Sequence, residues 1–337
     1  MYKFGLKLWS TNDFYVEEAV RLYKEGLYSY IELYVVPNSY DDYSGFWINL
    51  KIPFVIHAPH FKDGVNLAKS ENFCQNMDLA KEAIKWADKL DSKIIIFHPG
   101  ISGDEQETIR QLNEIKDKRI VIENKPYYTI SGDMVCNGHS PKQIKNILQK
   151  TELGFCLDVG HAVCFANAQK IAPTEIIKVF AKLKPKIFHL SDGDFGGSID
   201  QHLNIGFGSY NIDEILKLIP LGSFITIETN KKSKSDLIDF EEDIKKLNEI
   251  LLKKVSFRGA DIKDSELLLE WRNDSLTRNN SVNNNVVSLE EHKKWFSNSL
   301  NNQNRKIFMA QVGDLLIGTV RFDKEDVKTE RTLILGW

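Results

Sequence analysis

Short apolar runs alternate with amphipathic segments through the first 254 residues of the chain. Eight runs of four to eight residues are rich in Ile, Val and Phe and nearly continuous, which is typical of parallel strands buried on both faces. They span residues 3–9, 28–35, 54–57, 93–98, 119–123, 154–158, 186–190 and 224–228. Between them, a period near 3.6 predicts helices at 77–91, after 104–107, and at 140–148, 173–183, 212–218 and 236–252. Ser140 and Asn211 are expected to be N-caps.

The number of these units favours one architecture. Eight strands alternating with helices match a (β/α)₈ barrel, a TIM barrel. A doubly wound open sheet gives a similar pattern, but eight units is the full count of a barrel. The pattern stops at Lys253-Lys254, where a strand at 255–258 begins a segment with an Asn-rich loop at 279–285. We therefore predict an α/β barrel over residues 1–254 and a smaller α+β domain over residues 255–337.

Composition narrows the class of protein. Hydrophobic residues make up 42% of the chain and charged residues 27%, which supplies a sizeable core and excludes a disordered chain. With a net charge of −3, the chain has no overall positive charge that would attract nucleic acid or anionic lipid. The four cysteines show no C-x-x-C spacing, residues 1–10 carry no secretory signal, and no apolar run reaches the roughly 18–20 residues of a membrane span. We expect a soluble, cytoplasmic protein with no membrane partner.

Potential metal ligands follow six of the predicted strands. They are His57, His98, Glu123, Asp158, His161, His189 and Glu228, and the loop after the seventh strand adds Asp200 and His202. The carboxyl ends of all barrel strands converge on one face, so residues far apart in the sequence can share a pocket there. Imidazole and carboxylate groups are the ligand types of zinc or manganese.

A single histidine at a strand end is more often a hydrogen-bonded core residue than a metal ligand. Six of the eight histidines, however, lie at strand ends or in this one loop. Burying so many imidazoles and carboxylates together without a cation would be costly. The whole set therefore predicts a divalent metal centre at the carboxyl end of the barrel.

The motifs around these residues resemble one known family. In order they read HAP, FHPG, IEN, CLDVGH, FHLSD, DQH followed by NIGFG, and ETN. This series resembles the endonuclease IV family, AP endonuclease family 2, within the xylose isomerase-like TIM barrels, and it covers residues 1–252. The resemblance implies a trinuclear zinc cluster, with manganese or another divalent cation as alternatives. One metal would be held by His57, His98 and Glu123, a second by Glu123, Asp158, His189 and Glu228, and a third by His161, Asp200 and His202.

The activity that this resemblance implies is hydrolysis of phosphodiester bonds, with abasic DNA as a candidate substrate. A hydroxide bridging two metals is a nucleophile at neutral pH, and the metals neutralise the charge that develops on the phosphate. Glu123 and Glu228 are the expected catalytic residues, the first by bridging two metals and the second by orienting the water.

Four features depart from the DNA-repair members of the family. Residues 7–10 read KLWS where the family usually has His-x-Ser, and residues 32–37 lack its Arg-rich loop. His60-Phe61 replaces the Tyr-Leu wedge after HAP, and the barrel has only three arginines, Arg21, Arg110 and Arg119. No basic surface for duplex DNA is evident, so we expect weak, non-specific duplex binding.

A sugar isomerase or epimerase on the same barrel is the alternative function. Such enzymes hold a single metal with a Glu, Asp, His, Glu quartet, which Glu123, Asp158, His189 and Glu228 would supply. The two glutamates would then move a proton beside a carbonyl group of a small sugar. This alternative gives no role to His57, His98, Asp200 and His202.

The last 83 residues resemble the front half of a GNAT-type N-acetyltransferase. The matching stretches are 255–260, 271–274, 288–296 and 316–321, and Ser288-x-x-Glu291 predicts a capping box. The loop that grips the cofactor should follow residues 333–337, where the chain stops, so we expect a partial domain that would use acetyl-CoA only if intact. The simpler alternative is a generic α+β appendage. Such acetyltransferases often modify amino sugars of surface glycans, which associates the barrel with a sugar substrate.

Overall fold

The computed structural model describes residues 2–324 and 334–336, which form two compact units. The first unit spans residues 2–248, and the second begins at Glu249, within the last barrel helix. The border expected from the sequence lies at residue 254. No helix in the described ranges is long and apolar enough to cross a membrane.

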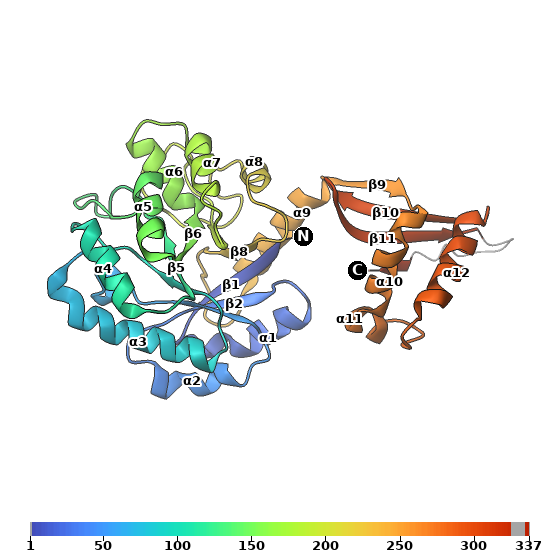
Figure 1. Ribbon diagram of the computed structural model, residues 1–337, viewed down its shortest axis with the longest axis horizontal. Helices are drawn as coiled ribbons and strands as arrows, with labels where there is room; N and C mark the ends of the chain where they lie inside the picture. The colour runs from blue at the N-terminus through green and yellow to red at the C-terminus, as the bar shows by residue number, and fades with distance from the viewer. Residues whose placement is uncertain (1, 325–333, 337) are drawn as a thin grey trace. The chain divides into compact units, whose positions relative to one another are not determined.

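Eight parallel strands close into a barrel in the first unit, with the helices around it (Figure 1). They are β1 Lys3–Trp9, β2 Tyr30–Tyr34, β3 Phe54–His57, β4 Ile95–Phe97, β5 Ile120–Glu123, β6 Gly154–Asp158, β7 Ile187–Leu190 and β8 Phe224–Ile227. Each strand pairs with the next in the sequence, and β8 pairs with β1, where Gly5 faces Thr226. The predicted TIM barrel is confirmed, and the open-sheet alternative is excluded.

The barrel helices cover the outside of these strands. They are α1 Val16–Lys24, α2 Tyr40–Ile48, α3 Phe73–Lys89, α4 Glu105–Ile115, α5 Pro141–Thr151, α6 Val159–Ala168, α7 Pro173–Ala181, α8 Ile212–Lys217 and α9 Ile238–Leu252. The sequence assigned no range to α1, α2 and α6. In α6 eight consecutive residues are buried, so no polar stripe marks the helical period. The side chains of Ser140 and Asn211 cap α5 and α8 as expected.

A layer of side chains from successive strands fills the barrel interior. It consists of Tyr30, Val55, Ile96, Val121, Cys156 and Ile187. The fully buried Tyr30 ring reaches across to β8, where its hydroxyl shares a 2.9 Å hydrogen bond with Thr226 Oγ1. Gly5 leaves the space for this ring, because a Cβ there would lie 2.3 Å from a ring carbon of Tyr30.

Gly5→Ala is expected to lower the free energy of unfolding of the barrel by about 2–3 kcal/mol, because the Tyr30 ring cannot move without losing its bond to Thr226. Gly45→Ala is the matched control, since nothing lies within 4 Å of a Cβ at this exposed position of α2. There, alanine should stabilise the helix by about 0.5–1 kcal/mol. Urea denaturation followed by circular dichroism measures both, and equal effects of the two substitutions would contradict the packing argument.

The second unit is an α+β arrangement with a four-stranded antiparallel sheet in the order β12-β11-β10-β9. Its strands are β9 Val255–Gly259, β10 Arg305–Val312, β11 Leu315–Asp323 and β12 Ile334–Gly336, and its helices are α10 Ser265–Asn273, α11 Ser275–Asn279 and α12 Leu289–Asn301. Leu268, Phe296, Ile307 and Met309 form its core. The capping box of Ser288 and Glu291 is present. Residues 333–337, after which the cofactor loop was expected, lie partly outside the described ranges, and the acetyltransferase resemblance stays a prediction.

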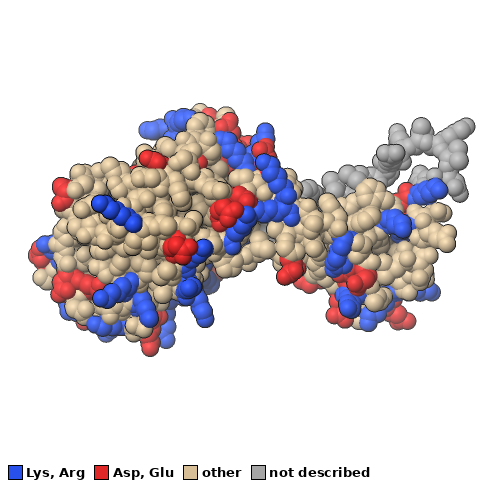
Figure 2. All heavy atoms as spheres, turned by 90° about the horizontal axis from the view of Figure 1, so that it is seen from above, with Lys and Arg blue, Asp and Glu red and all other residues tan. Residues whose placement is uncertain are grey.

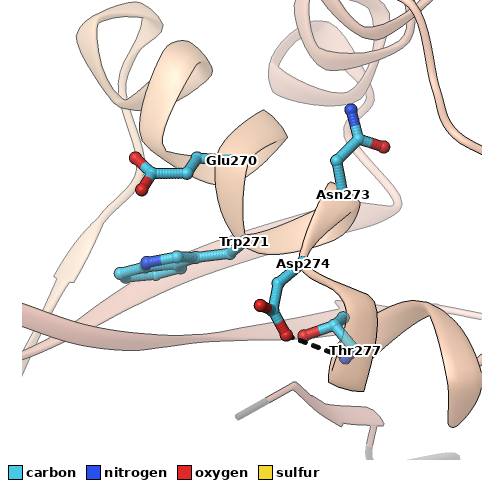
Figure 3. Close-up of a pocket in the computed structure, with 5 residues that line it drawn as sticks. All are labelled: Glu270, Trp271, Asn273, Asp274 and Thr277. Carbon is cyan, nitrogen blue, oxygen red and sulfur yellow. Dashed lines mark hydrogen bonds between the residues drawn. The ribbon is translucent and has the colours of Figure 1, made fainter. Parts of the chain in front are cut away.

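An open pocket of about 480 Å³ lies beside α10 and α11 (Figure 3). It is lined by Glu270, Trp271, Asn273, Asp274 and Thr277. The Asn273 side chain exchanges two hydrogen bonds with the backbone of Val287, and Asp274 Oδ1 accepts the N–H of Thr277. These hydrogen bonds hold the loop that contains Val287 and the start of α11. The polar side chains that line the pocket therefore stabilise the local structure of this unit.

Candidate metal centre

The carboxyl end of the barrel brings all nine predicted ligand residues together. His57, Glu123 and Asp158 end β3, β5 and β6, and Asp158 also caps α6. His189 lies within β7, whereas His98 and Glu228 directly follow β4 and β8. Asp200 and His202 lie in the loop between β7 and α8. Parallel closure of the barrel is therefore what makes these residues neighbours.

The ligand atoms form overlapping groups of three, each with all its atoms within 4.8 Å of one another. The groups are His57, His98 and Glu123; Glu123, Asp158 and His161; His161, Asp200 and His202; Glu32, His189 and Glu228; and Glu123, Cys156 and His189. Glu123, His161 and His189 each belong to more than one group, so the groups make one continuous centre. Cys156 and Glu32 were not among the predicted ligands.

Glu123 lies at the middle of the centre and is 1% exposed. Its Oε2 is 3.3 Å from His57 Nε2, 3.2 Å from His98 Nε2 and 3.3 Å from His189 Nδ1, and its Oε1 is 3.1 Å from His161 Nδ1. Four imidazoles therefore surround one buried carboxylate.

Backbone carbonyl groups orient three of the histidines. His57 Nδ1 lies 2.9 Å from the oxygen of Ala58, His161 Nδ1 2.8 Å from that of Asn124, and His202 Nδ1 2.9 Å from that of Glu228. A carbonyl oxygen only accepts, so Nδ1 carries a proton in each case and Nε2 is the ring nitrogen that a metal could use. This arrangement of the second ring nitrogen is typical of histidines that bind metals.

Two buried ring nitrogens of this centre, His98 Nε2 and His189 Nδ1, have no hydrogen-bond partner among the described residues. Each faces Glu123 Oε2, at 3.2 and 3.3 Å. A nitrogen lone pair opposed to a carboxylate oxygen in a buried site needs a cation or a proton between them. The residues present therefore fit a divalent metal ion.

The electrostatics of the centre point to the same conclusion. Burial, together with the nearby carboxylates of Asp200 and Glu123, raises the pKa of Asp158 to about 6. Burial lowers the pKa of His161, but Asp158 and Asp200 outweigh it and raise this pKa to about 10. Asp200 likewise raises the pKa of His202 to about 9 against burial. The excess negative charge thus attracts protons, and a bound metal would replace them.

Two further carboxylates hold the loop that carries Asp200 and His202. Asp192 accepts the backbone N–H groups of residues 193, 206 and 210. Asp243 on α9 accepts the N–H of Ile205 and the side-chain groups of Asn204 and Thr229. Both aspartates are buried, so the loop is fixed although it lies at the surface of the barrel.

Comparison with known proteins places the barrel in a family. The model of the xylose isomerase-like TIM barrel, AP endonuclease family 2, matches residues 28–251. The chain belongs to this family. The family contains both endonucleases and sugar epimerases, so membership alone leaves the reaction open.

Relatives of this xylose isomerase-like barrel include proteins named as endonucleases. A probable endonuclease 4 of Staphylococcus aureus is 26% identical over 190 residues, or 50% of this chain and 62% of that protein. An uncharacterized protein of Methanocaldococcus jannaschii is 27% identical over 223 residues, which is 61% of this chain and 73% of that protein.

Two solved structures have the same fold. A D-tagatose 3-epimerase-like protein is 21% identical with a TM-score of 0.57, covering 74% of this chain and 97% of its own. Endonuclease IV of Thermus thermophilus is 17% identical with a TM-score of 0.56, covering 74% and 99%.

Two charged residues of this xylose isomerase-like barrel were missed as part of the site. Lys7 on β1 forms ion pairs with Glu32 on β2, at 2.5 Å, and with Glu228. Glu32 is fully buried, and its Oε2 accepts from His189 Nε2 at 3.0 Å and from Thr226 Oγ1 at 2.6 Å.

Lys7 keeps its positive charge in this position. Burial lowers its pKa, but Glu228 and Glu32 outweigh burial and raise the pKa above its usual range. The signal in the sequence was a carboxylate inside the otherwise uncharged strand YIELY, opposite a lysine in KFGLKLW. A charge at the centre of a buried strand indicates a partner of opposite charge.

Proposed function

We propose that the barrel is a metal-dependent hydrolase of phosphodiester bonds that holds up to three zinc ions. The observation that supports this most is the continuity of the ligand groups, in which the shared residues Glu123, His161 and His189 connect one group to the next. A single-metal enzyme would have no use for the groups on either side of the central quartet.

The three proposed positions are those that the resemblance implies, and the first and third coincide with groups of neighbouring ligand atoms. His57, His98 and Glu123 would hold the first cation; Glu123, Asp158, His189 and Glu228 the second; and His161, Asp200 and His202 the third. When bound, such metals activate a water molecule and neutralise charge on a phosphate group.

The residues of the chain would then bind and orient the substrate. Glu228 would orient the attacking water, with Lys7 holding one of its carboxylate oxygens. Lys125 Nζ lies 3.5 Å from Glu123 Oε1 and 3.4 Å from His161 Nε2, where it could donate to a phosphate oxygen. Glu123 would bridge two cations and so fix their separation.

Sugar isomerisation or epimerisation is the second candidate function, and one observation favours it. The Lys7–Glu228 ion pair places a fixed positive charge next to one of the two glutamates that would move the proton of a sugar, which keeps that glutamate ionised as a proton acceptor. In that case Glu123, Asp158, His189 and Glu228 would hold a single divalent metal ion.

The test is to supply the zinc-loaded full chain with a chromogenic phosphodiester and with abasic oligonucleotides, single-stranded and duplex. We expect zinc-dependent cleavage. The duplex should be bound weakly and without sequence preference, since lysines and arginines are interspersed with acidic residues on the face in Figure 2. Deuterium exchange into a ketose without any phosphodiester cleavage would favour the isomerase instead.

For the second unit we propose a GNAT-type N-acetyltransferase fold. The antiparallel sheet, the helices between β9 and β10, and the capped α12 support this proposal. Acetyl-CoA would be the cofactor of such a domain. A sugar or sugar nucleotide would then be a substrate class that both units share.

A further inference from the structure

Lys7 brings a fixed positive charge to the wall of the metal centre. Its side chain is 14% exposed and lies between two carboxylates, Glu32 at 2.5 Å and Glu228. Glu32 has no exposed surface and is itself held by His189 and Thr226. The ammonium group is therefore held on two sides by the barrel wall.

The same oxygen of Glu228 serves two partners. Glu228 Oε1 accepts from Lys7 Nζ and lies 3.1 Å from His189 Nδ1, the buried nitrogen that lacks a hydrogen-bond partner in the part of the chain that is described. A cation bound between His189 and Glu228 would use this oxygen. Lys7 would then compete for one of its ligands and repel it from close by.

Glu32 has the opposite influence on this position. Its carboxylate balances the charge of Lys7, and by accepting from His189 Nε2 it turns the lone pair of Nδ1 toward the centre. The cation positions on either side are less affected, because the ion pairs of Lys7 within the described ranges are those with Glu32 and Glu228. Lys125 also brings a positive charge to those sides, but its Nζ is 3.4 Å from His161 Nε2 and 3.5 Å from Glu123 Oε1, whereas Lys7 Nζ lies 2.5 Å from Glu32 and is in direct contact with Glu228.

We propose that Lys7 makes the position of Glu123, Asp158, His189 and Glu228 the weakest of the three cation positions, and that Glu32 sets how much weaker it is. This inference rests on the proposed three-cation centre. Its consequence is that the outer two positions fill first when zinc is limiting. Occupancy of the central position then depends on zinc supply, which would regulate the activity of the centre.

The experiment is a zinc titration of the full chain in competition with a chromophoric chelator. Lys7→Met removes the positive charge while keeping a side chain of similar length. It should lower the dissociation constant of the weakest-bound zinc ion at least tenfold. Glu32→Gln leaves the charge of Lys7 unbalanced and should raise the dissociation constant of that zinc ion at least tenfold. The double variant should fall between them. Lys3→Met, the same substitution at the other end of β1, is the matched control and should leave all affinities unchanged.

Two outcomes would overturn the inference. One is an unchanged or lower zinc affinity of the central position in Lys7→Met, and the other is a higher zinc affinity of that position in Glu32→Gln. If Lys7→Met fails to fold by circular dichroism, Glu32→Gln and the charge-conserving Lys7→Arg, which should bind zinc like the wild type, still decide it. The number of zinc ions at saturation and phosphodiester cleavage test the proposed function separately. Three equivalents of equal affinity would therefore reject the role of Lys7 and leave the hydrolase standing.

Discussion

His98→Ala is expected to reduce phosphodiester cleavage by about a thousandfold, which corresponds to about 4 kcal/mol in the barrier. His98 Nε2 faces the bridging Glu123 at 3.2 Å and has no hydrogen-bond partner among the residues described. The substitution removes a ligand of the first cation position, and the cation is lost with it. Without that cation, no water is activated there and part of the charge on the phosphate is not neutralised.

The matched control is His139→Ala. His139 is also half-buried, but it packs on Tyr127 and Phe165 outside the metal centre, so cleavage should persist. Glu123→Gln and Glu228→Gln should abolish activity under either proposed function. Solvent exchange into a ketose that survives His98→Ala but not Glu228→Gln would contradict the hydrolase and identify an isomerase.

Removal of zinc is expected to lower the melting temperature of the barrel by at least about 5 °C. A ligand at 100 times its dissociation constant stabilises a protein by about 2.7 kcal/mol, and each kcal/mol shifts the melting temperature of a domain of this size by about 2–4 °C. The reason lies in the buried carboxylates, which are left without a metal and close together when zinc is removed.

Elemental analysis and thermal melting of the same samples measure this effect. The wild type should carry three zinc equivalents, whereas His98→Ala and His202→Ala should each lose part of the complement and part of the stabilisation. Lys3→Met again serves as control. Full metal content in both histidine variants would contradict the trinuclear assignment, and one equivalent in the wild type would favour the isomerase.

The sequence by itself was enough for the parts of the fold that depend on local periodicity. Nearly continuous apolar runs marked all eight strands, whose ends in the structure differ from the expected ones by a few residues at most. Counting eight units gave the barrel, and a barrel has one carboxyl face, so residues as far apart as His57 and Glu228 had to meet there. The end of this pattern also predicted a border at residue 254, and the second compact unit begins at Glu249.

Tertiary structure alone decided what surrounds the metal centre. The pair formed by Glu32 and His189 joins residues 157 positions apart, and the pair of Lys7 and Glu228 exists only because β8 closes on β1. The proton positions on the histidines likewise depend on carbonyl oxygens whose direction no residue pattern encodes. Periodicity reports which face of an element is buried, whereas the partner of a buried charge depends on how separate elements pack.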